Sequence, residues 1–487
     1  MTVGGGWGPT AEHNVVSGRG PHNGDQTFTF GRGGNQGGEG SETAGEWFIE
    51  NVMEELDAPN EYFYDNETKR LVMYYNATGT PPSDVVIPML TDMFRLNGTM
   101  DAPVKAVTFN GLTFTQNRPT FLDPRGNPSG GDWALERMGA LFLEGTENVT
   151  ITNNLFTKLD SNAVMISGYN RGVVVSQNEF SWLGQNCVAS WGRSDFYDGR
   201  RAEVPFHTRL SGNWAHEIGH YQKQSSFYFQ AETAMTTIRD NVVFNIPRAG
   251  INFNDGFGGG SVVSGNLMFN SCRESSDHGA FNSWDRLPYL TTVRSPTAST
   301  IPAYNDFHHN FIVANYAADG GCLDNDDGSQ YYAIHDNFCV YGGHKSDFDG
   351  NSKHSFNNLH IYPQVYGAKC LGIMAQVLPP KGYAEGYYNN TCVLQDSNPS
   401  YLDISGIRDG KCLDGTSGSK QAFEDGLIVG NNTVYVPANS KAYVKCGGAN
   451  VSMGDFQKMG YDAGSTTVQG LPSADTIIQW AHAVLWP

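Results

Sequence analysis

The sequence has few basic residues and no long apolar run. It holds 31 Lys and Arg against 50 Asp and Glu, which gives a formal net charge of −19. No Lys/Arg-rich stripe is present to neutralise phosphates, so we expect no nucleic-acid partner. A strongly anionic polymer would be repelled as well. No stretch of about 20 apolar residues occurs, and we therefore expect no membrane span.

The N-terminus lacks the charged and apolar regions of a signal peptide. The eight cysteines form no CxxC pair and have no zinc-type spacing. Seven N-x-[ST] sequons and the even number of cysteines nevertheless indicate a secreted protein whose leader is missing from this chain. We expect disulfides in the C-terminal half, among Cys370, Cys392, Cys412 and Cys446. Cys187 and Cys339 are explained as readily as small apolar core residues.

The sequence does contain a recurring marker, in which one or two polar residues precede an Asn that an apolar residue usually follows. The marker asparagines are Asn154, Asn178, Asn213, Asn241, Asn266, Asn310, Asn337, Asn358, Asn390 and Asn432. Short β-rich runs, bounded by Gly, Asn, Asp and Ser, lie between them. A recurrence in the twenties, stretched by loops, predicts a right-handed parallel β-helix with three short strands in each coil. We expect each marker Asn to occupy the same bend, to stack up the solenoid and to adopt the αL conformation.

The chain divides into a central solenoid and two terminal segments. We predict an N-terminal Gly-rich segment and cap at 1–103, the β-helix at 104–450 and a C-terminal cap at 451–487. Apolar spacing at 46–60 predicts a short helix in the first segment, followed by a hairpin at 61–75 and a strand at 85–90. A helical pattern that begins at Ser473 ends the chain.

Acidic windows fall at similar offsets after three consecutive markers. Stacked coils lie about 4.8 Å apart, so these windows should converge on one face. The candidate catalytic residues are Asp277, Asp285, Asp324, Asp326 and Asp327. The candidate substrate-binding residues are Trp191, Tyr228, Gln230, Asn252, Asn254, Asp255, His278, Trp284, Arg286 and Lys345.

Paired carboxylates of this kind suit glycoside hydrolysis. One, with its pKa raised, protonates the leaving oxygen, and the other attacks the anomeric carbon or activates water. Aromatic side chains beside them would stack on sugar faces. Each window also reads as an ordinary turn. Asp324, Asp326 and Asp327 would equally suit a calcium ion, which prefers oxygen ligands.

Six stretches resemble a known family: 117–124, 128–145, 221–232, 247–260, 274–286 and 324–343. They are similar to right-handed β-helix proteins of a glycoside hydrolase family with α-L-fucosidase and xylanase activities. The resemblance implies that the functional carboxylates are aspartates. It places one at Asp277 or Asp285, and another at Asp324, Asp326 or Asp327.

Together these patterns predict an extracellular enzyme that hydrolyses a polysaccharide or oligosaccharide and requires no cofactor, with calcium as an optional ligand. A polysaccharide lyase or uronate epimerase is the second hypothesis. Its base and cations would come from Lys223, Arg248, Arg273, Arg286 and Lys345. A non-catalytic matrix or cell-wall protein that binds glycans is the third, because the fold alone supports all three. The sequence does not indicate an oligomeric state.

Overall fold

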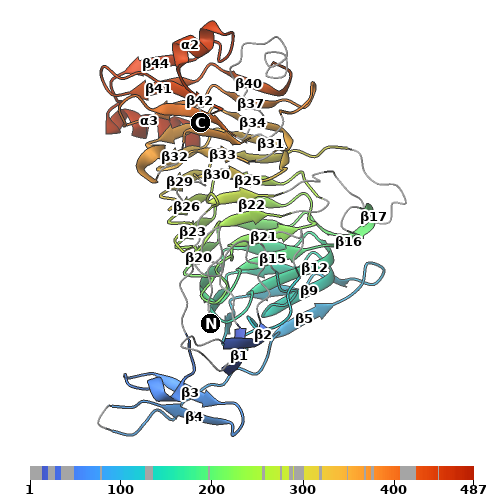
Figure 1. Ribbon diagram of the computed structural model, residues 1–487. Helices are drawn as coiled ribbons and strands as arrows, with labels where there is room; N and C mark the ends of the chain where they lie inside the picture. The colour runs from blue at the N-terminus through green and yellow to red at the C-terminus, as the bar shows by residue number, and fades with distance from the viewer. Residues whose placement is uncertain are drawn as a thin grey trace.

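The computed structural model describes most of the chain. The described residues are 14–19, 28–33, 49–76, 79–126, 135–195, 198–254, 258–274, 277–284, 289, 301–316, 321–347, 349–366, 369–374, 378–405, 424–447 and 449–486. The protein is mostly β, with three long sheets in which nearly all strands run parallel (Figure 1). Successive strands enter the three sheets in turn, and we call one such passage a circuit.

Sheet 1 carries most of the described candidate site residues. Its strands are β5 (Phe94–Asn97), β6 (Val104–Lys105), β9 (Leu141–Glu147), β12 (Val164–Arg171), β15 (Val188–Trp191), β18 (Pro205–Phe206), β21 (Tyr228–Ala231), β24 (Ile251–Phe253), β27 (Phe281–Ser283), β30 (Leu323–Asn325), β33 (His344–Ser346), β36 (Leu371–Met374), β39 (Ser400–Ser405), β42 (Tyr443–Cys446) and β43 (Ala449–Ser452). The last pair, β42 and β43, is antiparallel.

Sheets 2 and 3 complete each circuit. Sheet 2 contains β7 (Thr108–Asn110), β10 (Thr150–Thr152), β13 (Val174–Ser176), β19 (Arg209–Ser211), β22 (Thr237–Arg239), β25 (Val262–Ser264), β28 (Asn305–His308), β31 (Gln330–His335), β34 (Asn351–Phe356), β37 (Glu385–Tyr388) and β40 (Leu427–Gly430). Sheet 3 contains β8 (Thr113–Thr115), β11 (Leu155–Leu159), β14 (Glu179–Leu183), β20 (Trp214–His216), β23 (Val242–Phe244), β26 (Leu267–Phe269), β29 (Phe311–Val313), β32 (Phe338–Val340), β35 (Leu359–Ile361), β38 (Thr391–Val393), β41 (Thr433–Val436) and β44 (Thr466–Gln469).

The short strands bury a continuous core because equivalent residues of neighbouring circuits stack. Phe114, Phe156 and Phe180 form one such stack, with ring centroids 4.5 and 4.9 Å apart. These rings belong to one apolar cluster that receives side chains from all three sheets. No single circuit could bury its apolar residues alone, and each depends on its neighbours.

The marker asparagines form the predicted hydrogen-bonded ladder. The side-chain amide of Asn241, for example, donates to Oδ1 of Asn266 at 2.9 Å, and so does its backbone N–H at 3.0 Å. The same pair of bonds recurs from Asn154 to Asn432, and every marker is buried. The prediction that the asparagines stack is confirmed.

The prediction that the marker Asn itself adopts the αL conformation is wrong. The positive φ falls on the residue just before it, as at Gln177, Asp240 and Asp336, with φ of 55°, 57° and 52°. The residue before the marker makes the bend, and the buried Asn after it bonds to the next circuit. This explains why the residue before each marker varies while the Asn recurs.

Replacing Asn241 by Ala should destabilise the protein by about 2–4 kcal/mol, because it orphans the buried backbone and amide donors of Asn213. Thermal melting would measure the loss. The control is Asn110→Ala, which removes only an exposed bond from Asn153 and should cost less than about 0.5 kcal/mol. Equal melting temperatures for the two variants would contradict the role given to the ladder.

The N-terminal elements agree only in part with the predictions. The hairpin is present as β3 (Tyr62–Asp65) and β4 (Arg70–Met73). The predicted helix at 46–60 is wrong within the described residues, which contain a single 3₁₀ turn, η1 (Met53–Glu55), with none of its residues buried. Asn51 has a φ of 59° and bonds to the backbone of Tyr64 through its side chain, which competes with helix formation.

The strand predicted at 85–90 is also wrong, because this segment is mostly exposed and pairs with no described strand. Pro88 lacks the N–H that a paired strand would need.

The C-terminal helix is confirmed as α3 (Ala474–Leu485), capped by the Ser473 hydroxyl. It follows α2 (Met453–Lys458) and packs on sheet 3. Among the described residues, no helix is long and apolar enough to cross a membrane.

Remaining short elements are the antiparallel pairs β1 (Asn14–Arg19) with β2 (Phe28–Gly33) and β16 (Arg193–Asp195) with β17 (Asp198–Glu203), and the 3₁₀ helix η2 (Pro363–Tyr366).

Two of the cysteine predictions are confirmed. Cys370 and Cys392 form a disulfide, and Cys446 is also disulfide-bonded. Cys187 and Cys339 are buried as free thiols in the core cluster.

Candidate active site

Polar residues replace apolar ones on the outer face of sheet 1 at four successive strands. Asn252, Asn282, Asp324 and Lys345 are register partners in β24, β27, β30 and β33. The residues before and after each of them point inward, as Leu323 does. Side chains alternate along a strand, so these four form one row on the outer face.

A second outer row follows two residues further along each strand. It contains Asn254, Trp284, Asp326 and Asp347. Their backbone N–H groups continue the sheet pairing, with Trp284 donating to Phe253 O at 2.7 Å and Asp326 donating to Ser283 O at 2.8 Å. The two rows bring acidic residues from β30 and β33 next to one another.

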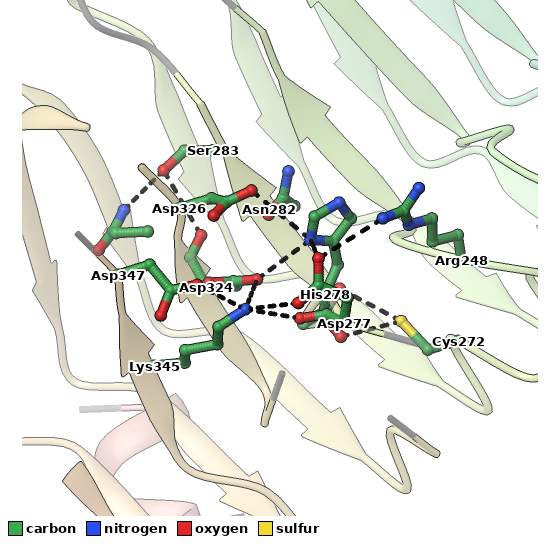
Figure 2. Close-up of polar contacts among 12 residues, drawn as sticks. Arg248, Cys272, Asp277, His278, Asn282, Ser283, Asp324, Asp326, Lys345 and Asp347 are labelled. Carbon is green, nitrogen blue, oxygen red and sulfur yellow. Dashed lines mark hydrogen bonds and ion pairs between the residues drawn. The ribbon is translucent and has the colours of Figure 1, made fainter. Parts of the chain in front are cut away.

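The ammonium group of Lys345 is the centre of this cluster (Figure 2). Its Nζ lies 2.7 Å from Asp347 Oδ2, 3.0 Å from Asp277 Oδ1 and 3.3 Å from Asp324 Oδ2. It also donates to the backbone carbonyl of Asp277 at 2.8 Å. Burial by itself would lower the pKa of Lys345, but the surrounding carboxylates raise it well above its usual value. The side chain is therefore a permanent cation.

Asp277 enters the cluster from the segment before β27. His278 is buried, and its Nδ1 lies 3.3 Å from Asp324 Oδ2, 3.8 Å from Asp277 Oδ2 and 3.9 Å from Asp326 Oδ2. The guanidinium of the fully buried Arg248 lies 3.7 Å from Asp277 Oδ2. Asp277 has a φ of 85°, a conformation that is rare outside glycine and that clusters at functional sites.

The aspartates of this cluster have oppositely shifted pKa values. Burial would raise the pKa of Asp277, but His278, Lys345 and Arg248 together lower it to about 2. Burial raises the pKa of Asp326 to about 7, against the attraction of Lys345. It raises the pKa of Asp324 and of Asp347 as well. At mild acidity Asp277 is therefore ionised while Asp326 holds its proton.

Solvent exposure separates these four aspartates into two groups. The side chains of Asp277 and Asp326 are 24% and 19% exposed, whereas those of Asp324 and Asp347 are 0% and 7% exposed. Asp277 and Asp326 can thus reach a ligand. Asp324 and Asp347 are less accessible and contact Lys345 instead.

Asp277 and Asp326 are also close to each other. One carboxylate oxygen from each, together with a ring nitrogen of His278, form a group of atoms that all lie within 4.8 Å of one another. The backbone N–H of Asp327 donates to Asp326 Oδ1 at 2.9 Å, which fixes the second carboxyl group. An ionised and a protonated carboxyl group are therefore adjacent.

A second group of acidic oxygens within 4.8 Å of one another comes from Asp326, Asp327 and Asp347. This differs from the predicted calcium ligands, because Asp347 takes the place of Asp324. Asp324 points instead to Lys345 and His278. The donor set suits a hard cation, although the Lys345 ammonium already contacts Asp347 and would repel a second positive charge nearby.

Two residues predicted to bind substrate face the core instead, and those predictions are wrong. Tyr228 is fully buried in the core cluster, with its hydroxyl 3.3 Å from Thr236 Oγ1. Gln230 pairs in register with the core residue Phe253 and shares its inward face. The alternation along β21 places Phe229, between them, on the outer face.

Trp191 lies on the outer face but far from the aspartates. Four strand spacings separate it from Asp326 along the second row, or about 19 Å. The guanidinium of Arg137 covers its ring at 3.9 Å. Trp284 lies one spacing from Asp326 and is half-buried. Asp255, Asp285 and Arg286 lie outside the described residues.

Asp347 was not among the predicted site residues, and Arg248 was predicted only as a cation for a lyase. The spacing Lys345-x-Asp347 repeats the Asp324-x-Asp326 spacing one circuit earlier, so the same outward alternation could have identified Asp347. Arg248 precedes β24, and no sequence pattern indicates that it approaches Asp277 in the next circuit.

Comparison with known proteins supports the fold alone. No protein-family model matches the chain, and no curated protein matches it. A solved structure described as "Glycoside hydrolase" is similar, with a TM-score of 0.52 and 14% identity over 74% of this chain and 65% of that one. Another, "The complex structure of XylC with xylose", gives a TM-score of 0.42 and 12% identity over 79% and 62% of the two chains. This chain thus spans slightly under two thirds of the length of either structure.

Proposed function

We propose that this protein is an extracellular glycoside hydrolase that acts on a polysaccharide or oligosaccharide, built as a right-handed parallel β-helix whose faces are the three sheets. One observation carries the proposal: Asp277 and Asp326 are adjacent, partly exposed and oppositely protonated. Glycoside hydrolysis requires such a pair. The fold shared with a glycoside hydrolase is consistent with it.

The roles follow from the two pKa shifts. Asp326 holds a proton near neutrality and is the general acid that protonates the leaving oxygen. Asp277 is ionised and is the nucleophile, which attacks the anomeric carbon and forms a glycosyl ester. Asp326, deprotonated in that step, then removes a proton from the water that hydrolyses the ester, and so regains its own proton.

The short separation of the two carboxyl groups favours this retaining route. Retaining pairs are about 5–5.5 Å apart, whereas inverting pairs stand about 6.5–9.5 Å apart to admit a water molecule. Oxygens of Asp277 and Asp326 lie within 4.8 Å of each other. Direct attack by Asp277 thus fits the site better than attack by an interposed water.

The pH profile should be bell-shaped. Activity requires Asp326 protonated, so it should fall as pH rises through the Asp326 pKa of about 7. It also requires Asp277 ionised, so it should fall as pH drops toward the Asp277 pKa of about 2. The dependence of kcat/KM on pH measures both limbs. Activity that keeps rising above pH 8 would contradict the role of Asp326.

A panel of 4-nitrophenyl glycosides and neutral oligosaccharides tests the function itself. Hydrolysis should release a product whose anomeric configuration, followed by NMR before mutarotation, matches that of the substrate. Inversion would remove Asp277 as nucleophile. A complete lack of hydrolysis, combined with binding of the same glycans, would favour a glycan-binding matrix protein.

A calcium-assisted lyase or epimerase is the second proposal, and the acidic group of Asp326, Asp327 and Asp347 supports it. These residues would hold the ion, which would neutralise a uronate carboxylate. Lys345 does not suit the role of base, since its pKa is raised and it stays charged. Lys223 and Arg273 are paired with Glu274 and Glu217. Unsaturated uronate products, detected by absorbance and abolished by EDTA, would favour this proposal.

We also propose secretion and N-glycosylation. Within the described residues, the disulfide Cys370–Cys392 suits an oxidising compartment. The sequon residues Asn389 and Asn431 are exposed at bends that precede marker asparagines. Treatment of protein from a eukaryotic host with a peptide N-glycosidase should lower its mass.

A further inference from the structure

The outer face of sheet 1 is covered before the site is reached. Leu135 is buried against the outward residues Phe142, Met165, Ala189 and Phe229, which belong to four successive strands from β9 to β21. These side chains form one apolar cluster, separate from the core inside the sheets. A ligand that lies along this face therefore cannot extend over β9 to β21.

The covering segment is fixed in place by buried polar contacts. Arg137 donates to Ser167 Oγ at 3.0 Å and to the carbonyl of Trp191 at 2.7 Å. Glu136 and Arg125 form a buried ion pair at 2.9 Å. Removing either partner would leave an unpaired buried charge, so this segment is held firmly in the fold. We call this segment, together with the apolar cluster beneath it, the wall.

The wall ends at Trp284, one strand spacing from Asp326. Trp284 packs against the apolar cluster and is itself half-buried. The outward residues Asn252 and Asn282 are fully buried. Among the described residues that follow the wall along the outer face, Trp284, Asp277 and Asp326 are the first with partly exposed side chains. The reactive pair therefore stands at the closed end of the outer face.

In the opposite direction the described residues of the outer row are accessible in part, at Gly372 and Lys445 but not at Asp403. Gly372 follows Lys345 in register, and Asp403 and Lys445 follow Gly372. A Cβ built on Gly372 would meet no atom closer than 3.7 Å. Lys445 is 46% exposed and pairs with Asp403 at 3.1 Å. Beside this row, Met374 continues the second row and is half-buried.

We propose that the enzyme is exo-acting and removes a single sugar from a chain end. The terminal sugar lies over the Asp277–Asp326 pair beside Trp284, and the rest of the substrate lies over Gly372 toward Asp403 and Lys445. Trp284 stands only one strand spacing, about 4.8 Å, from Asp326, so the wall leaves no room along the outer face for a further sugar beyond the terminal one. Hydroxyl groups of a neutral glycan match the carboxylate and ammonium of the Asp403–Lys445 pair. This inference rests on the proposed hydrolase function.

Product analysis tests the mode of action. The probes are the 4-nitrophenyl glycoside that the enzyme cleaves best and a hexasaccharide of the same sugar, labelled with a fluorophore at its reducing end. Exo-action releases the monosaccharide from the start and shortens the labelled chain one unit at a time. Labelled di- and trisaccharides among the earliest products would overturn the inference while leaving the hydrolase function intact. No cleavage of either probe, or of the other glycosides in the panel, would overturn both.

A variant at Gly372 tests the direction of the substrate. Gly372→Trp should raise KM for the hexasaccharide by roughly tenfold or more, because its side chain fills the path of the leaving chain. The effect on the aryl glycoside, whose leaving group is shorter, should be smaller. The matched control is Ile428→Trp, at an exposed position of sheet 2, which should change neither KM. An equal KM for the hexasaccharide in both variants would overturn the assigned direction.

Discussion

Replacing Asp277 by Asn should lower kcat by about 10⁴-fold while the protein stays folded. The amide cannot attack the anomeric carbon, so the loss should be the same for every leaving group. The lowered pKa of Asp277 means that its charge also stabilises the fold, so the melting temperature should fall as well, and kcat is compared at a temperature where both proteins are folded. Steady-state kinetics on a series of aryl glycosides with leaving groups of different acidity measures the loss.

The variant Asp326→Asn is the matched comparison, since it removes the acid and keeps the nucleophile. We expect its kcat to fall by about 10²- to 10⁴-fold on substrates with a poor leaving group. Dinitrophenyl glycosides, whose leaving group needs no proton, should lose far less. If both variants responded alike to the leaving group, the two roles assigned to these aspartates would be wrong.

Replacing Lys345 by Met should have the largest effect on stability. The ammonium neutralises three buried or half-buried carboxyl groups, and removing one partner of a buried ion pair costs about 3–5 kcal/mol. Methionine keeps most of the volume, so the loss reports on charge. Thermal melting at several pH values would measure it.

The pH dependence of this loss has a definite sign. Without Lys345, the folded pKa of Asp324 rises further above the unfolded value of about 3.9, so stability is retained at low pH and lost as pH rises. The gap in melting temperature between variant and parent should therefore widen as pH rises. A constant gap would mean that the loss comes from packing.

Lys445→Met provides the control for this experiment. Lys445 occupies the same outer row and also pairs with an aspartate, Asp403, but it is half exposed. Ion pairs of that kind contribute about 0–1 kcal/mol. A loss as large as that of Lys345→Met would show that burial does not explain the difference.

The asparagine ladder was predictable because its signal lies in single residues. Each marker Asn makes the same bonds whatever the length of the loop before it, so the ladder from Asn154 to Asn432 could be read directly. The αL position was misassigned because the pattern alone does not show which of two adjacent residues makes the bend. The segment at 46–60 failed because the contacts of Asn51 with a later strand outweigh helical spacing.

The site was predictable in part for the same reason. Asp277, Asp324 and Asp326 were identified because acidic windows recurred at similar offsets, and the structure brings them together around Lys345. Their protonation states depend on burial and on the position of Arg248, which no spacing reveals. Tyr228 was misplaced because a strand of four residues does not show which side faces inward.

The asparagine ladder also sets how freely this protein can change. The step from Asn266 to Asn310 spans 44 residues and the step from Asn337 to Asn358 spans 21, yet the amide bond is 2.9 Å long in both. Chain inserted between two ladder residues leaves the frame undisturbed. New loops could therefore be grafted beside the Asp277–Asp326 pair, by evolution or in the laboratory, without refolding the scaffold that holds it.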